Sequence, residues 1–291
     1  MDINLLGALC VTENGVSIAP TAPKPRQVLA LLALHADQVV PVTELIEDLW
    51  SGQPPRSART ALQTYVMQLR ELIATALVKD SPAGGGPRDA KDVLTTLPGG
   101  YLLVSGGGTS DVREFERLSA TGRRAMDTGD YAGAARKLRD ALGLWTGSAF
   151  TDVQTGTQLE MEALRLEESR LCALGHRIEA DLYLGRHREL LAELTMLTGR
   201  YRAHENLHAQ FMLALYRSGR RGEALDAYHR LRGTLVREIG LEPSAPLQRL
   251  QQSILMADPE TPLPPDPLAA LSAKPERGLA PCISRSLSDA G

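Results

Sequence analysis

The chain has 291 residues, 43% of them hydrophobic, and a formal net charge of −3 at pH 7. This length is enough for two domains with apolar cores, and no apolar run approaches the roughly 18 residues of a membrane span. The charge excludes a nucleic-acid binder that relies on a strongly basic overall field, and the N-terminus lacks the basic start of a signal peptide. Three widely spaced cysteines, Cys10, Cys172 and Cys282, argue against a disulfide framework, so we expect a cytoplasmic protein. Cys10 and Cys172 stand in apolar surroundings, where we expect them to be buried.

The first hundred residues predict a small unit that mixes strands and helices. Apolar residues around the turn Glu13-Asn14-Gly15 predict short strands within residues 1–20. Residues 25–36 then show the spacing of a strongly apolar helix, against which two further helices can pack. These are predicted at residues 42–50 and 56–73, and the prolines of the intervening SGQPPR exclude one continuous helix.

The segment 56–73 is the most informative part of the sequence. Apolar residues at Leu62, Val66, Leu69 and Ile73 recur at helical spacing, which predicts one buried face. The opposite face carries mostly side chains that can hydrogen-bond base edges or phosphates, and within this segment no acidic residue precedes Glu71. We expect base and backbone contacts to DNA from Thr60, Gln63, Thr64, Met67, Gln68 and Arg70, with Arg59 on phosphate.

A hairpin is predicted directly after this helix, because DVLTTLPGGYLLV places two β-prone runs around a proline and two glycines. Helix, loop, helix and hairpin in this order predict a winged helix-turn-helix. We expect the hairpin region to add DNA contacts through Arg88, Lys91, Gly99, Gly100 and Tyr101, although Tyr101 is equally compatible with the core. Residues 1–110 hold eight Lys/Arg against ten Asp/Glu, so the basic footprint should be small and a single copy should bind weakly.

The rest of the chain is predicted to be helical up to about residue 258. Gly129, Gly185 and Gly219 each follow one apolar helix and precede another, and the last two lie 34 residues apart, which is the period of tetratricopeptide repeats. The Gly/Pro-rich segment 81–88 predicts a loop, and the proline-rich segment 259–291 predicts a disordered tail. The predicted fold is mainly α with small β elements: a winged helix-turn-helix in residues 1–106 and an all-α tetratricopeptide-like domain in residues 111–258.

One short motif points to a different chemistry. Residues 204–208, HENLH, match the H-E-x-x-H pattern of zinc hydrolases. No third ligand follows at a characteristic spacing, and the neighbouring Leu207, Phe211 and Leu215 are needed for packing within the repeats. We therefore predict no metal site, no cofactor and no enzymatic activity.

These segments together resemble the Streptomyces antibiotic regulatory proteins. The resemblance covers residues 3–255 and rests on RQVLALLAL, VTELIEDLW, ALQTYVMQLREL and PGGYLL in the first part, and on FERL, ALGLW and ALYRSGRRGEALDAYHRLRGTLVREIGLEPS in the second. It implies an OmpR-type winged helix-turn-helix, of the kind found in two-component effectors, followed by a bacterial transcriptional activation domain. The chain is most similar to the small two-domain members, which lack an ATPase module.

The resemblance implies an activator of antibiotic or other secondary-metabolite genes that binds direct repeats near the promoter −35 element and recruits RNA polymerase. Two copies would bind side by side on the repeats, as a possible dimer on DNA, without any membrane partner. The implied partners of the helix-turn-helix loop and the repeats are the sigma and alpha subunits. We expect exposed polymerase contacts at Glu47, Asp48, Gln53 and Arg56, unless these charges simply solvate a helix. The alternative function is a repeat-based scaffold or sensor that does not bind DNA directly.

Overall fold

The computed structural model describes residues 1–78 and 89–256 of the chain. The predicted loop 81–88, which includes Arg88, and the predicted disordered tail 259–291 lie outside the described residues. Contacts divide the chain into two compact units, residues 1–185 and residues 186–291, and each is described by itself below. No helix among the described residues is long and apolar enough to cross a membrane.

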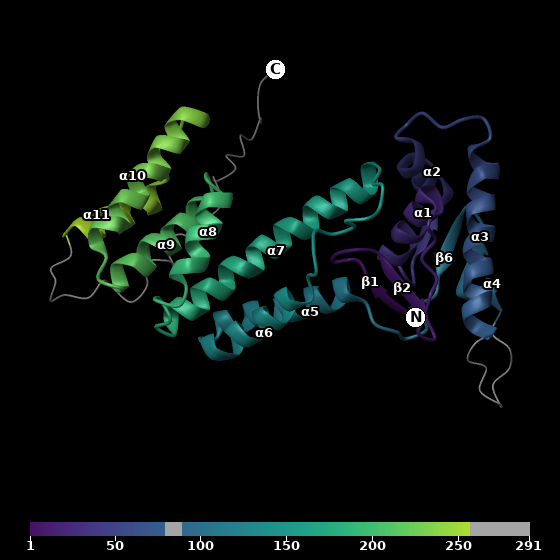
Figure 1. Ribbon diagram of the computed structural model, residues 1–291, viewed down its shortest axis with the longest axis horizontal. Coiled ribbons are helices and arrows are strands. Elements are labelled where there is room, and N and C mark those ends of the chain that lie inside the picture. The colour runs from purple at the N-terminus through teal and green to yellow at the C-terminus, as the bar shows by residue number, and fades with distance from the viewer. Residues whose placement is uncertain (79–88, 257–291) are drawn as a thin grey trace, which may run out of the picture. The chain divides into compact units, whose positions relative to one another are not determined.

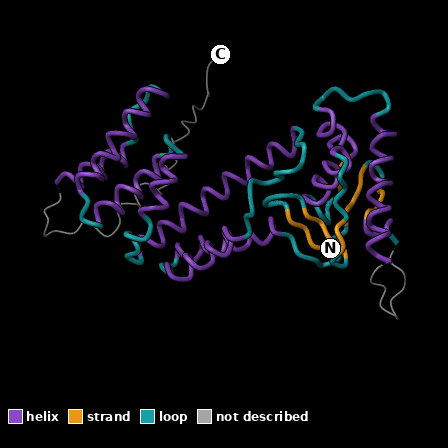
Figure 2. Tube along the Cα trace, in the orientation of Figure 1, coloured by secondary structure: helices purple, strands orange, loops and turns teal. Residues whose placement is uncertain are grey.

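The first unit begins with a small antiparallel sheet of β1 (Asp2–Asn4), β2 (Cys10–Glu13) and β3 (Val16–Ser17) (Figure 2). Asn14 and Gly15, both with positive φ, form the tight turn between β2 and β3, as the sequence predicts. Cys10 on β2 is exposed, and so is Cys172, so the prediction that these two thiols are buried is wrong. In β2 it is the next residue, Val11, that points into the core, because successive side chains of a strand alternate between faces.

Three helices pack beside this sheet: α1 (Pro23–Leu34), α2 (Val42–Trp50) and α3 (Ala58–Val78) (Figure 1). Proline occupies the first turn of α1, where its missing N–H costs no hydrogen bond. The apolar residues predicted to face the core from α3, Leu62, Val66, Leu69 and Ile73, are each at most 2% exposed. The helix-turn-helix arrangement predicted from the sequence is therefore confirmed.

A second antiparallel sheet has the order β4-β6-β5, with β4 at Val39–Pro41, β5 at Leu94–Leu97 and β6 at Gly100–Leu103. The pair β5–β6 is the predicted hairpin, which we call the wing, and the short helix α4 (Ala90–Val93) leads into it. β4 was not predicted. It pairs with β6 in the register Val40↔Tyr101 and ends at Pro41, the N-cap of α2. The wing is thereby attached to the chain just before the helix-turn-helix.

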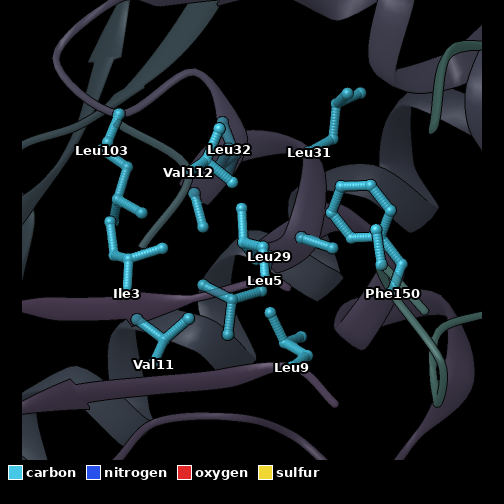
Figure 3. Close-up of a cluster of buried hydrophobic side chains, with 14 of the residues drawn as sticks. Ile3, Leu5, Leu9, Val11, Leu29, Leu31, Leu32, Leu103, Val112 and Phe150 are labelled. Carbon is cyan, nitrogen blue, oxygen red and sulfur yellow. The ribbon is translucent and has the colours of Figure 1, made fainter. Parts of the chain in front are cut away.

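The first unit also contains α5 (Asp111–Asp127), α6 (Tyr131–Gly143) and α7 (Thr157–Tyr183). Figure 3 shows that Val112 of α5 and Phe150, which precedes α7, lie in the same apolar cluster as Ile3 of β1 and Leu32 of α1. Asp111 reinforces this junction, since its Oδ2 accepts hydrogen bonds from the backbone N–H groups of Leu5 and Leu6 at 2.7 and 2.8 Å. The apolar core is thus continuous across residues 106–111, and a domain boundary there remains a prediction.

The second unit consists of α8 (Leu191–Arg200), α9 (Glu205–Arg217), α10 (Arg221–Glu238) and α11 (Ala245–Met256) (Figure 1). Gly219 has φ +80° in the turn between α9 and α10, a conformation that glycine adopts without steric cost. The buried alanines Ala214 and Ala224 allow these two helices to pack closely. The predicted fold class, a winged helix-turn-helix followed by all-α repeat-like structure, is confirmed.

Candidate nucleic-acid interface

The outer face of α3 presents a continuous exposed stripe. Its buried face is held by α1 and α2, so the opposite side chains are free to contact a ligand. Met67 is 55% exposed and lies among polar neighbours. The exposed members of the stripe are all residues that the sequence predicted to contact DNA: Arg59, Thr60, Gln63, Thr64, Met67 and Gln68.

The turn before α3 sets how its first residues are presented. α2 ends at Trp50, and its C-cap Ser51 has a left-handed backbone that is followed by Gly52 with φ +82°, so the chain turns away from the helix here. Residues 51–57 are exposed throughout, including Gln53 and Arg56. Arg56 and Arg59 therefore supply positive charge at the N-terminal end of α3, where the helix dipole adds to it.

Arg70 has a different environment from the other stripe residues. Its guanidinium donates two hydrogen bonds to the carbonyl of Leu94, at 3.0 and 2.7 Å, and one to Thr96 Oγ1 at 2.8 Å. The side chain is half-buried and connects α3 to β5. Arg70 thus positions the wing relative to α3, and a direct DNA contact from it remains a prediction.

Of the wing residues predicted to contact DNA, one is exposed and two are buried. Gly99 is exposed at the turn, with φ +83°. Gly100 is buried, and a Cβ there would lie 2.6 Å from the carbonyl oxygen of Val40. Its lack of a side chain is therefore required by the close approach of β4. Tyr101 is 7% exposed and belongs to the hydrophobic core, which is the second of the two environments that the sequence allowed.

Lys91 lies on α4, which leads into the wing, and its surroundings are acidic. It is exposed on α4, whose N-terminus carries a capping box formed by Asp89 and Asp92. These two carboxylates lie close in sequence to Lys91, and among the described residues Arg56 and Arg59 are the exposed cations at the start of α3. The small basic footprint expected from the composition remains a prediction.

Asp48 is the clearest correction to the sequence analysis. It was expected on an exposed acidic surface of α2, together with Glu47, but it is only 2% exposed. Its carboxylate accepts hydrogen bonds from the backbone N–H of Gln158 at 2.9 Å and from the side chain of Gln27 at 2.8 Å. A buried carboxylate needs such partners, and they make Asp48 unavailable to another protein. Glu47, Gln53 and Arg56 are exposed, as expected.

The H-E-x-x-H segment has a structural role in the second unit. His204 is the N-cap of α9, and its Nδ1 accepts a hydrogen bond from the N–H of Leu207 at 3.3 Å. Glu205 accepts one from the N–H of Ser244 at 2.9 Å, and His208 is buried. Among the described residues, no three His, Cys, Asp or Glu side chains are grouped so that they could hold a metal ion. In this motif His204 therefore caps the start of α9, and His208 is part of the buried interior of the second unit.

An exposed polar stripe on a helix, supported by a second helix and flanked by a wing, is suited to insertion into the major groove of DNA. Two family models match the chain in the corresponding regions. The model "Transcriptional regulatory protein, C terminal" matches residues 18–83, and the model "Bacterial transcriptional activator domain" matches residues 110–255. The fold and these matches define a DNA-binding transcriptional activator.

Curated relatives agree with this class. The chain is 54% identical to the regulatory protein DnrI of Streptomyces peucetius over 259 residues, which covers 89% of this chain and 93% of DnrI. It is 36% identical to the regulatory protein AfsR of Streptomyces coelicolor, covering 88% of this chain but 24% of that longer protein. A solved structure of Mycobacterium tuberculosis EmbR, in complex with a low affinity phosphopeptide, matches with a TM-score of 0.81 and 32% identity, covering 93% of this chain and 68% of EmbR. The chain belongs to the Streptomyces antibiotic regulatory protein family of transcriptional activators.

Proposed function

We propose that this activator binds direct repeats near the −35 element of promoters in a secondary-metabolite gene cluster and recruits RNA polymerase there. The observation that carries the proposal is the exposed stripe from Arg59 to Gln68 on α3. Gln63 and Gln68 can form bidentate hydrogen bonds to adenine edges, Thr60 and Thr64 can donate to bases or phosphates, and Met67 can pack against a thymine methyl group.

Two adjacent copies are needed for useful specificity on this account. A single helix contacts few base pairs, and Arg56 and Arg59 are the exposed cations at the start of α3. Side-by-side copies on direct repeats would add their contacts, with the repeats spaced by about 10 bp or a multiple of it. This arrangement requires no two-fold dimer in free solution.

Polymerase contacts would come from exposed residues outside the DNA-contacting stripe. We assign Glu47, Gln53 and Arg56, on α2 and the following turn, as candidates for contact with the sigma or alpha subunits. Asp48 is excluded from this set by its burial. Helices α5 to α11 offer further surface for the polymerase. No step of this function requires catalysis.

A mobility-shift experiment tests the proposal. The probes are promoter duplexes from the chain's own gene neighbourhood, in three versions: unchanged, with 5 bp inserted between repeats, and with 10 bp inserted. We expect cooperative binding to the first, its loss on the second, and partial recovery on the third, because only the third restores the helical phase. Equal binding to all three would contradict the paired arrangement. Failure to bind any duplex specifically would favour the scaffold alternative.

A further inference from the structure

The second unit contains a pocket of about 450 Å³ between α8, α9 and α10. All of its lining residues belong to that unit, so it is separate from the stripe on α3. The polar and charged lining includes Thr198 of α8, His208 of α9 and Glu223 and Arg230 of α10, together with Arg202 and Arg220 from the turns before α9 and α10. Three arginines against one carboxylate give this lining a net positive charge.

His208 is a buried polar group whose ring lies near backbone groups of Arg202 and Thr198 but makes no hydrogen bond of good geometry with them. It is 8% exposed, its ring lines the pocket, and neither ring nitrogen meets a partner at normal hydrogen-bond geometry. Burial, together with the nearby Arg230 guanidinium and His204 ring, lowers the pKa of His208 to about 4, and backbone groups of Arg202 and Thr198 only partly oppose this shift. Leaving such a group unsatisfied costs free energy, so a ligand that hydrogen-bonds the ring would be favoured.

Two of the arginines are available to a ligand. Arg230 is exposed and makes no hydrogen bond or ion pair within residues 1–78 and 89–256. Arg202 approaches Glu238 only at 4.0 Å. By contrast, Arg220 is engaged in a two-point pair with Glu223, at 2.7 and 2.5 Å. Arg202 and Arg230 are therefore the arginines of this pocket that are least closely paired with a carboxylate.

We propose that this pocket binds a small organic anion, with its oxyanion group held by Arg202 and Arg230 and a hydrogen bond from His208. Guanidinium groups match carboxylates and phosphates through paired N–H donors. The apolar side chains of Phe211, Ala227 and Leu231 also line the pocket and would cover a nonpolar part of the ligand. A bound anion compensates the positive charge around His208 and favours its protonated form.

The test uses the full chain and three probes that share one ring: benzoate, phenyl phosphate and the neutral phenol, at constant ionic strength. Binding is followed by the NMR signal of the His208 imidazole, identified by its loss in His208→Gln. We expect a saturable shift with at least one anion and none with phenol. The anion that binds more tightly distinguishes a carboxylate site from a phosphate site.

Matched variants separate a built site from general attraction. Arg230→Gln should weaken anion binding about tenfold or more, because it removes a charge-assisted contact. Arg249→Gln removes an exposed arginine on α11, outside the pocket, and should leave binding unchanged. Because Arg230 is exposed, its substitution should not impair folding. Equal weakening in both variants, or no saturable binding, would overturn the proposal. Binding of an acidic peptide without binding of either small anion would also overturn it, in favour of a protein contact.

Discussion

The carboxylate of Asp48 caps α7, with its Oδ1 accepting a hydrogen bond from the backbone N–H of Gln158 at 2.9 Å. The N–H of Leu159 donates to the same oxygen at 3.1 Å. The segments around Asp48 and Gly156 approach so closely that a Cβ on Gly156 would lie 1.8 Å from the carbonyl oxygen of Asp48. Because α2 packs against α3 and against α7, this junction ties the helix-turn-helix directly to α7.

Removal of this cap should destabilise the first unit. Asp48→Ala leaves the N–H groups of Gln158 and Leu159 without their acceptor and removes one of the two hydrogen bonds of the Gln27 amide, which keeps the backbone carbonyl of residue 48. We therefore expect a loss of roughly 2–3 kcal/mol in the free energy of unfolding. The neighbouring Glu47→Ala serves as the control and should change it by less than about 0.5 kcal/mol, since Glu47 is exposed. Urea unfolding followed by circular dichroism measures both. Similar values for the two variants would argue against a capping role.

Substitutions at Arg70 and Arg59 should have different effects on the stability of the chain and on its affinity for DNA. Arg70→Met removes the three hydrogen bonds to Leu94 and Thr96 and should cost about 1–2 kcal/mol of stability. Arg59→Met alters an exposed side chain, so it should leave stability unchanged but weaken DNA binding. Thermal unfolding and mobility shifts on the same preparations compare the two. An Arg70→Met protein as stable as the parent would contradict the positioning role.

The polymerase contacts proposed for α2 can be tested without Asp48. Glu47→Ala combined with Gln53→Ala should leave promoter occupancy nearly intact, because neither residue belongs to the stripe on α3. Transcription by purified RNA polymerase should fall at equal occupancy. We expect Glu71→Ala, which removes another exposed acid, to leave this transcription unchanged. If transcription by the double variant falls only in proportion to promoter occupancy, helices α5 to α11 become the remaining candidate for the polymerase contact.

The stability of the chain should decrease as the pH falls from about 6.5 towards 4. Burial holds the pKa of His208 at about 4, whereas an unfolded histidine takes up its proton near 6.5, so acidification favours the unfolded state in this window. The difference between these two pKa values corresponds to roughly 3 kcal/mol in the free energy of unfolding. Burial also lowers the pKa values of His176 and His187, which add to the same trend.

The contribution of His208 is isolated by substitution. Unfolding measured between pH 7 and 4 should show a shallower pH dependence for His208→Gln than for the parent chain. His229→Gln, at an exposed position, is the matched control. A parent-like slope in His208→Gln would show that His208 does not titrate as its burial indicates. A saturating anion should itself reduce the slope if it binds beside His208.

The sequence predicts the helices and the wing well because their signals are local. The bounds of α2 match the predicted residues 42–50, since a proline precedes the apolar period and a left-handed turn follows it. Strand β4 has three residues and forms because Val40 pairs with Tyr101, far along the chain, so no local pattern indicates it. Long-range pairing of this kind lies outside what periodicity can detect.

The same distinction holds for the candidate site. The exposed stripe on α3 follows from helical spacing alone, because the buried positions of one helix determine which residues face outward. The environments of Asp48 and Arg70 depend on partners that are distant in sequence, Gln158 and Leu94. An acid on an otherwise exposed helix is normally solvated, and an arginine on a candidate DNA-binding face normally suggests phosphate. Only the tertiary structure shows that these two side chains serve the fold.

Selection of bound duplexes from a random library tests most directly whether α3 determines which DNA is bound. The parent chain, Gln63→Ala and Arg59→Ala are selected in parallel, and the recovered sequences are compared. We predict that the parent enriches a direct repeat, that Gln63→Ala changes the base preference at the same position in each repeat, and that Arg59→Ala keeps the motif with lower recovery. An unchanged motif with Gln63→Ala, or no enriched motif with the parent chain, would contradict the account.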